Sequence, residues 1–238
     1  MTAKTTWKPP ARRRIGAVRD RLRGYYGRPR NEPHHAPLDE LVLTVLSQNT
    51  NDRNRDVAYV RLRARFPGDG LRPDWSAVAA APVEEIEEAI RPGGISKVKS
   101  LRIKSMLVVI EAETGGFDIG FLAQTPGDEA IEFLERLPGV GRKTAACVLM
   151  FAFDRPEIPV DTHVYRVCTR LGLIRPKASF EEAHDVMRAA TEPADAFELH
   201  VNLIRHGRRI CTARKPACPA CPLLGVCPYG KDAIRRSP

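Results

Sequence analysis

The sequence lacks any apolar run that approaches the length of a membrane-spanning helix, and no hydrophobic stretch follows its charged N-terminus. The first absence argues against a helical membrane protein, and the second argues against a secretory signal. An arginine-rich start is also found in organellar transit sequences, but here the segment soon becomes an amphipathic helix. The 238 residues suffice for one large or two modest domains with a hydrophobic core.

Strand patterns are also missing, because no segment alternates polar and apolar residues between hairpin turns. Helical periodicity dominates instead, and the internal stop and start signals fit it. Gly115 and Gly116 end one apolar-periodic run, while Ser179 and Glu182 form a capping box of the S-x-x-E type before another. The pattern predicts an all-α protein of about nine to eleven short helices. The stretch 116–130 looks like a long connection with no role that the sequence indicates.

Positive charge is concentrated at the two ends of the chain, and the formal net charge is +9. Residues 1–30 hold ten Lys or Arg and one Asp, and residues 205–238 hold eight Lys or Arg and one Asp. The middle is therefore net negative. If the ends meet in space they form a basic surface suited to a polyanion, whereas a solvated basic tail would merely aid solubility.

Cysteine is scarce except in one cluster, where four of the six cysteines fall in the pattern C-x6-C-x2-C-x5-C. These four are Cys211, Cys218, Cys221 and Cys227. Four thiolates in so short a loop can enclose zinc or an iron–sulfur cluster. Zinc ribbons usually pair two C-x2-C knuckles across a longer spacer, so the spacing favours a [4Fe–4S] cluster. Cys147 and Cys168 lie in apolar helical runs and are expected to pack in the core.

Arg214 and Lys215 lie between the first two cysteines of the cluster, on a loop that a metal centre would fix at both ends. Such a loop could present its cations to a backbone phosphate, or the two residues could simply be solvated. The other signals in the chain favour phosphate contact.

A glycine-containing turn, LPGVGRKTA, separates two apolar helical runs at residues 137–145. Gly139 and Gly141 allow a sharp turn and a close approach, and the N–H groups at the start of the next helix suit a phosphate. This pattern is typical of a helix-hairpin-helix. Lys143 falls in the first turn of the second helix, where the amine could bind phosphate or act as a nucleophile. The helix N-terminus and an expected partial burial both favour its neutral, nucleophilic form.

Asp161 lies eighteen residues beyond Lys143, in IPVDTHVYRVCTRLG, at the start of a predicted helix. Aspartate is a common helix N-cap, and capping alone would explain it. A capping carboxylate is also held rigidly. Facing a lysine, it could stabilise positive charge that develops on a sugar ring while the amine attacks.

Taken together, LPGVGRKTA, VDTH, HGRRICTARKPAC and the cysteine spacing resemble the endonuclease III family of bifunctional DNA glycosylases, from about Arg14 to Lys231. The resemblance implies a six-helix barrel with the helix-hairpin-helix at 30–155. It implies a second helical domain, carrying the [4Fe–4S] cluster, built from 13–29 and 156–238, after a basic flexible tail at 1–12. Damaged DNA would lie in the cleft between the domains, with the target nucleotide flipped out.

The resemblance also assigns roles to residues and implies partners. Lys143 would attack C1′, form a Schiff base and lead to β-elimination, and Asp161 would assist it. The expected substrate is duplex DNA that contains either a damaged base, namely an oxidised pyrimidine, or an abasic site. The protein is expected to act as a monomer in the cytoplasm, associated with the nucleoid in a prokaryote. The residues expected to contact DNA are Gly139, Val140, Gly141, Arg142, Thr144, Gln48, Asn49, Arg214 and Lys215.

One stretch departs from the family pattern. Relatives of the enterobacterial enzyme carry SAQATD, whose glutamine fills the gap left by the flipped base, whereas residues 47–52 here read SQNTND. Asn49 aligns with that glutamine and Gln48 precedes it, so either could fill the gap. The alternatives are a monofunctional adenine glycosylase, disfavoured by Lys143, a mismatch-directed uracil or thymine glycosylase, and a non-catalytic DNA-binding protein, disfavoured by the Lys143–Asp161 pair.

Overall fold

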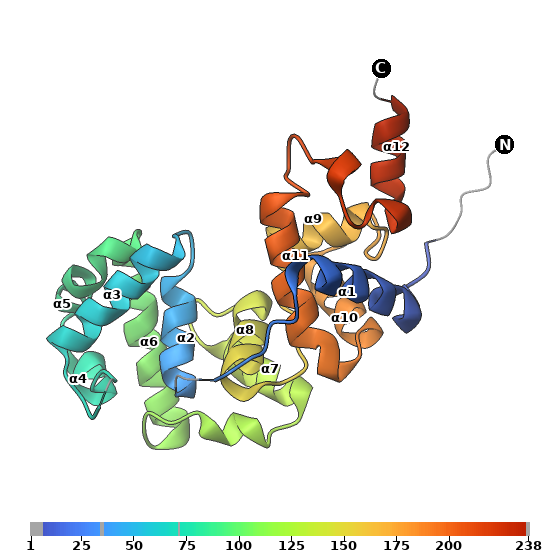
Figure 1. Ribbon diagram of the computed structural model, residues 1–238. Helices are drawn as coiled ribbons and strands as arrows, with labels where there is room; N and C mark the ends of the chain where they lie inside the picture. Colours follow the sequence, from blue (N-terminus) through green and yellow to red (C-terminus); the bar gives the residue numbers. More distant parts are fainter. Residues whose placement is uncertain (1–6, 34–35, 71, 237–238) are drawn as a thin grey trace. The chain divides into compact units, whose positions relative to one another are not determined.

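The computed structural model describes residues 7–33, 36–70 and 72–236, and nearly all of their regular secondary structure is helical (Figure 1). The described residues form twelve α-helices and five short 3-10 segments, and their only β pairing is an isolated bridge between Pro67 and Pro73. The all-α prediction is confirmed. The number of α-helices exceeds the expected nine to eleven, because helices as short as the six-residue Trp75–Ala80 span too few turns to show periodicity.

The chain divides into two compact units. Unit 1 comprises residues 1–32 and 154–238, and unit 2 comprises residues 33–153. Unit 1 contains α1 (Arg12–Tyr26), α9 (Thr162–Arg170), α10 (Phe180–Ala190), η3 (Pro193–Asp195), α11 (Ala196–Arg209), η4 (Cys218–Ala220), η5 (Leu224–Val226) and α12 (Pro228–Arg236). Unit 2 contains α2 (Pro37–Leu46), α3 (Asp52–Arg65), α4 (Trp75–Ala80), α5 (Val83–Ile90), η1 (Arg91–Gly93), α6 (Ser96–Thr114), η2 (Gly120–Ala123), α7 (Gly127–Arg136) and α8 (Arg142–Phe153).

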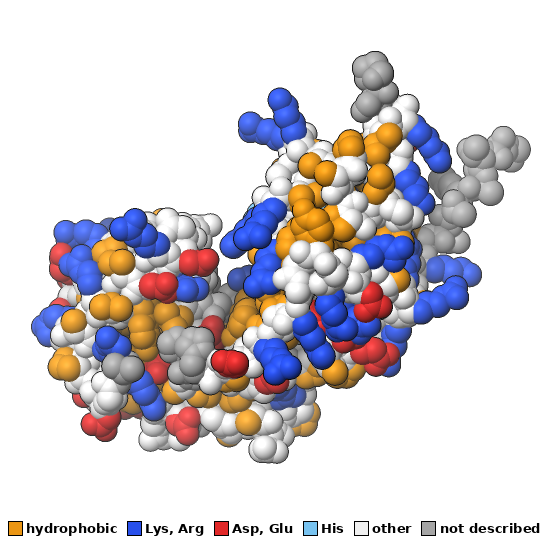
Figure 2. Space-filling view, in the orientation of Figure 1, with side chains coloured by type: hydrophobic (Ala, Val, Ile, Leu, Met, Phe, Trp, Pro, Cys, Tyr) orange, Lys and Arg blue, Asp and Glu red, His pale blue; other side chains and the backbone are white. Residues whose placement is uncertain are grey.

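Both ends of the chain belong to unit 1, where α1 packs on α11. Helix α1 buries Ile15, Val18 and Leu22 on one face. Its arginines meet acidic residues: Arg23 forms a bidentate pair with buried Glu198 at 2.7 and 2.6 Å, and Arg19 pairs with Asp195. Part of the basic charge at the N-terminus is therefore neutralised within the protein rather than presented to a polyanion. Figure 2 shows Lys and Arg side chains spread over the visible face of this unit.

The N-terminal tail expected over residues 1–12 lies partly outside the described residues, which begin at Trp7. Pro10 is buried and α1 already begins at Arg12. None of the helices in the described part of the chain combines the length and apolarity that crossing a membrane would need.

Unit 2 is built around α2, which is buried on nearly every side. The connection between α6 and α7, which had no assigned role, covers the core: Ile119 and Leu122 are fully buried, and the Phe121 ring packs edge-on against Phe133 at 5.1 Å. Helix α6 ends at Gly115 in the left-handed conformation, as the glycine pair predicted.

Helix α10 begins as the capping box predicts, since Ser179 Oγ accepts a hydrogen bond from the Glu182 N–H at 3.1 Å. The reciprocal half of the motif is different. The Glu182 carboxylate pairs with Arg175, at 2.5 Å for each oxygen, instead of reaching back to the Ser179 backbone.

A lysine in the core holds two turns of unit 2 together. Lys99 on α6 is fully buried, and its Nζ donates to the carbonyl of Leu46 at 2.6 Å and to that of Gly93 at 2.7 Å. Leu46 ends α2 and Gly93 ends η1, so the ammonium group satisfies carbonyls that the ends of helices leave unpaired. Burial, helped by the charge of Arg102, lowers the pKa of Lys99 to about 8.

We expect Lys99→Met to destabilise unit 2 by about 1–3 kcal/mol at neutral pH, because two buried carbonyls lose their donor. The pKa of Lys99 is about 8 in the folded state and has its ordinary value of 10.5 in the unfolded state. Between pH 8 and 10.5 the unfolded state therefore binds more protons than the folded state. The unfolding free energy of the wild type should therefore rise across this pH window relative to that of the variant.

Urea unfolding, followed by the fluorescence of buried Trp75 in a Trp7→Phe background, measures both effects. A stability difference between wild type and Lys99→Met that stays constant from pH 7 to about 10.5 would contradict the shifted titration.

Candidate nucleic-acid interface and iron–sulfur site

The turn between α7 and α8 has the form expected of a helix-hairpin-helix. Gly139 adopts φ +82°, the left-handed region that favours glycine, and the N–H of Val140 donates to the Leu137 carbonyl at 3.0 Å. The side chains of Leu137 and Val140 are buried, and they anchor the turn in the core of unit 2. Val140 can therefore offer only its backbone to a ligand.

The two glycines of this turn serve different ends. A Cβ on Gly139 would lie 2.4 Å from Cδ of Arg102, so the glycine is needed both for its φ angle and for the arginine that covers it. A Cβ on Gly141 would meet nothing within 4 Å, and its φ angle is not positive. Gly141 is exposed, and the space beside it is open to a ligand.

Lys143 is exposed in the first turn of α8, one residue beyond the half-buried Arg142. The partial burial expected of Lys143 is therefore wrong, because the side chain stands clear of the core. Thr144, by contrast, is buried, and its Oγ1 faces the Gln48 amide at 3.5 Å.

The turn at residues 47–51 separates the two candidates for filling a DNA gap. Gln48 is half-buried and engaged: its Nε2 donates to the Gly139 carbonyl at 3.2 Å, and its Oε1 accepts from Arg102 at 2.7 Å. Asn49 is exposed and left-handed at φ 53°.

Ile95, also in unit 2, is a second exposed non-glycine residue with positive φ, at 42°. A β-branched residue is strained in this region, and such strain is concentrated at functional sites.

Asp161 is the N-cap of α9 in unit 1, and its Oδ1 accepts from the Val164 N–H at 2.7 Å. The preceding residue is also fixed, because the Val160 N–H donates to Nε2 of buried His184 at 2.9 Å. Lys143 belongs to unit 2, so the two predicted catalytic residues are carried by different units.

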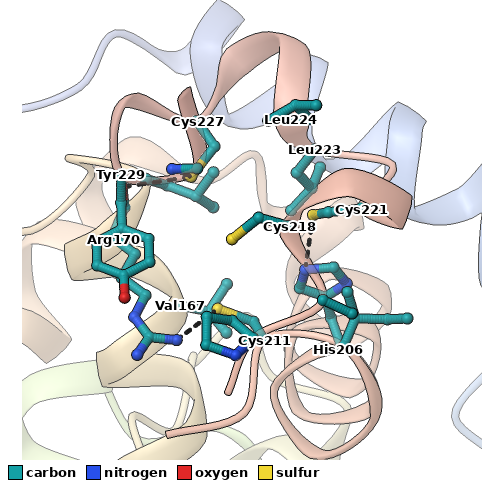
Figure 3. Close-up of a pocket in the computed structure, with 15 residues that line it drawn as sticks. Val167, Arg170, His206, Cys211, Cys218, Cys221, Leu223, Leu224, Cys227 and Tyr229 are labelled. Carbon is teal, nitrogen blue, oxygen red and sulfur yellow. Dashed lines mark hydrogen bonds between the residues drawn. The ribbon is translucent and has the colours of Figure 1, made fainter. Parts of the chain in front are cut away.

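The four clustered cysteines line one cavity in unit 1 (Figure 3). Their thiols are not paired in disulfides, and among the described residues no three His, Cys, Asp or Glu side chains converge as they would on a single metal ion. The remaining walls are mostly apolar, from Val167, Leu171, Ile210, Leu223 and Leu224. Four thiols around a shared space fit a multi-iron cluster better than a single zinc ion, which needs its ligands close to one point.

Polar groups lie close to three of the four sulfur atoms. Arg170 donates to Cys211 Sγ at 3.2 Å, and the Gly230 N–H donates to Cys227 Sγ at 3.3 Å. His206 lies 3.5 Å from Cys221 Sγ, and burial lowers its pKa to about 4, so it is neutral at physiological pH. Burial also raises the pKa of the Cys221 and Cys227 thiols. Backbone hydrogen bonds to these thiols lower the pKa, and metal binding would lower it further.

Helix α9 holds the cysteine loop, which the sequence did not predict. Arg170 donates to the carbonyls of Thr212 at 2.7 Å and Ala213 at 2.9 Å, and Arg166 donates to the Cys211 carbonyl at 3.0 Å. Arg214 and Lys215 are exposed on the same loop. Cys147 and Cys168 lie in the core, as predicted.

The comparisons with known proteins agree with this geometry. A model described as HhH-GPD superfamily base excision DNA repair protein matches residues 42–194, and one for the iron-sulfur binding domain of endonuclease III matches residues 211–227. The chain is 31% identical to endonuclease III of Sulfolobus acidocaldarius over 195 residues, covering 82% of this chain and 83% of that protein.

It is also 34% identical to endonuclease III of Bacillus subtilis, covering 85% of this chain and 86% of that protein. A solved structure of a trapped endonuclease III–DNA covalent intermediate, in an estranged-adenine complex, matches with a TM-score of 0.78 and 30% identity. The match covers 95% of this chain and 100% of that one.

We expect Gly139→Ala to destabilise unit 2 by about 1–2 kcal/mol, because alanine is strained at positive φ and its Cβ displaces Arg102. Gly141→Ala is the matched control and should change the unfolding free energy by less than about 0.5 kcal/mol. Equal effects of the two substitutions in urea unfolding would contradict the distinction between the glycines.

Purified protein should be yellow-brown and contain about four iron atoms per chain, and Cys218→Ser should lose most of the iron and the visible absorption. Metal analysis and absorption spectra measure this, with Cys147→Ser as the control that retains iron, since Cys147 lies in the other unit. A colourless wild type with one zinc ion per chain would contradict the assignment.

Proposed function

The chain belongs to the endonuclease III family of base excision DNA repair proteins, and on this basis we propose that Lys143 and Asp161 carry its DNA glycosylase and AP lyase chemistry. The observation that carries the proposal is the position of Lys143, an exposed amine in the first turn of α8, directly after a hairpin that can bind phosphate. Phosphate binding there would fix the amine relative to the sugar of one nucleotide.

In the proposed reaction, Nζ of Lys143 attacks C1′ of the damaged nucleotide and forms the C1′–N bond. The glycosidic bond breaks, and its electron pair leaves with the base, which takes up a proton. Opening of the sugar ring gives a Schiff base between Lys143 and C1′. Loss of a proton from C2′ then expels the 3′ phosphate, which cleaves the strand on the 3′ side of the abasic site.

Asp161 would act on the same sugar. Its Oδ1 is fixed by the cap to Val164, so the carboxylate keeps one orientation, and its negative charge would stabilise positive charge developing at C1′. It would also help to activate the amine of Lys143. The two residues lie in different units, so the proposal requires both units to engage the same nucleotide.

The DNA-binding residues of the proposal offer either backbone N–H groups or exposed side chains. In the hairpin, Gly139, Val140, Gly141, Arg142 and Thr144 would bind a phosphate through the turn and the positive end of α8. Arg214 and Lys215 would bind a second phosphate from the cysteine loop. Asn49, exposed and left-handed, would fill the gap left by the flipped base, whereas the contacts of Gln48 hold Gln48 against the hairpin.

The four cysteines Cys211, Cys218, Cys221 and Cys227 would hold the family's [4Fe–4S] cluster. The cluster would supply four iron–thiolate bonds, and these would fix the loop that carries Arg214 and Lys215. The arginines of α9 hold the same loop through its carbonyls, so loop and helix form one support for Asp161.

The proposed substrate is duplex DNA that contains an oxidised pyrimidine or an abasic site, bound by a monomer. One observation favours a second candidate, a mismatch-directed uracil or thymine glycosylase. Residues 47–52 read SQNTND instead of SAQATD, so an asparagine occupies the position that would face the opposite base. A shorter amide there changes which opposite bases can be contacted.

Borohydride trapping on duplexes with an abasic site, thymine glycol or a T:G mismatch tests the mechanism and the substrate together. We expect adducts on the abasic and thymine glycol duplexes. Lys143→Gln should abolish them while DNA binding persists, because it removes the amine that would form the Schiff base. Asp161→Asn should slow trapping by about 100-fold or more, because it removes the charge that faces C1′.

An adduct on the mismatch duplex without one on thymine glycol would replace the proposed substrate by the second candidate. Trapping that survives in Lys143→Gln would show that another amine is the nucleophile and would overturn the assignment. Lys177→Gln, an exposed lysine of unit 1, is the matched control and should trap like the wild type.

A further inference from the structure

Side chains from three segments of unit 2 meet over the hairpin. Arg102 comes from the middle of α6, Gln48 from the turn after α2, and Thr144 from the first turn of α8. The Arg102 guanidinium donates to Gln48 Oε1 at 2.7 Å, and Gln48 Nε2 donates to the Gly139 carbonyl at 3.2 Å and to Thr144 Oγ1 at 3.5 Å. Gln48 therefore joins the arginine to the backbone of the hairpin.

The stem of Arg102 also lies directly on the hairpin. A Cβ built on Gly139 would approach its Cδ to 2.4 Å, its Cγ to 2.7 Å and its Nε to 2.9 Å. The arginine thus contacts the turn through its aliphatic part and grips Gln48 with its charged end. An arginine in van der Waals contact along its stem is held in one orientation, so its hydrogen bond orients Gln48 in turn.

The preceding turn of α6 holds the same region from inside. Lys99, three residues before Arg102, binds the carbonyls of Leu46 and Gly93. Leu46 is two residues before Gln48, so α6 holds the start of the 47–51 turn through Lys99 and the turn itself through Arg102. Lys99 and Arg102, both on α6, therefore fix the position of the exposed 47–51 turn.

We propose that Arg102 is a positioning residue for DNA binding, which acts by locking Gln48 against the hairpin so that the hairpin and the 47–51 turn engage the duplex as one preformed surface. The inference rests on the proposed function, in which both segments contact DNA. With Gln48 locked, Asn49 projects as the tip of the turn. Without Arg102, Gln48 is released and the two segments must be ordered when DNA binds, which costs affinity.

A double-mutant cycle tests whether Arg102 acts through Gln48. The variants are Arg102→Met, Gln48→Met and the double substitution, and the measurement is Kd for a duplex with a tetrahydrofuran abasic-site analogue, which binds without chemistry. Each single substitution should weaken binding by about tenfold, the worth of one charge-assisted hydrogen bond. The double variant should lose about as much as one single variant, since both remove the same lock.

The salt dependence of Kd separates positioning from direct phosphate contact. A lost phosphate contact lowers the slope of log K against log salt by about 0.9, so Arg102→Met should leave the slope unchanged if Arg102 only positions. Arg61→Met removes an exposed cation on α3 that pairs with Glu88 on α5. As the matched control it should change Kd by less than about twofold.

Additive losses in the cycle, or a slope that falls by the value of one phosphate, would overturn the proposal. Thermal unfolding of each variant accompanies the binding data. If Arg102→Met does not fold, Arg102→Lys replaces it in the cycle and should also weaken binding, because lysine cannot pack along Gly139 and reach Gln48 in the same geometry. Failure of trapping by the wild type would defeat the proposed function, whereas the binding cycle does not depend on catalysis.

Discussion

The buried ammonium group of Lys99 joins the end of α2 to the turn before α6. Two exposed turns of unit 2 depend on this contact. Lys99 satisfies carbonyls of both segments, at a cost visible in its lowered pKa. The turns that these segments lead into carry Asn49 and Ile95, two exposed residues in the left-handed region. Strained turns persist only when neighbouring structure fixes them, and here that structure is one lysine and, a turn later on the same helix, Arg102.

Features that depend on neighbours in the sequence could be predicted. The hairpin at 137–145, the glycine end of α6, the serine cap of α10 and the aspartate cap of α9 all involve groups three or four residues apart, and the structure has each of them. The four-cysteine loop is similarly local. Asp161 shows the limit of this reasoning, because its capping bond is equally consistent with a structural and a catalytic role.

Contacts between distant residues could not be predicted, and they changed several interpretations. The acidic residues that neutralise arginines of α1 lie about 175 positions after them in the chain. From the sequence alone, the basic charge of the N-terminus therefore seemed more available to DNA than the structure shows it to be. The role of Lys99 also depends on a distant partner, the carbonyl of Leu46. One signal could have identified this lysine: it precedes Ile103 by four residues and therefore shares the buried face of α6 with Ile103, Met106 and Ile110. Arg102 had no such signal, since only the folded hairpin brings Gly139 and Gln48 to it.

The route of the chain through the two units has a consequence for synthesis on the ribosome. Unit 2 is continuous, so it can fold as soon as α8 has emerged. Unit 1 is not: α1 is made first, yet the helix that covers Ile15, Val18 and Leu22 is α11, made almost last. The nascent chain must therefore carry an uncovered apolar face through most of its translation. Arg19 and Arg23 of α1 lack their native partners over the same period, because Asp195 and Glu198 are also made late.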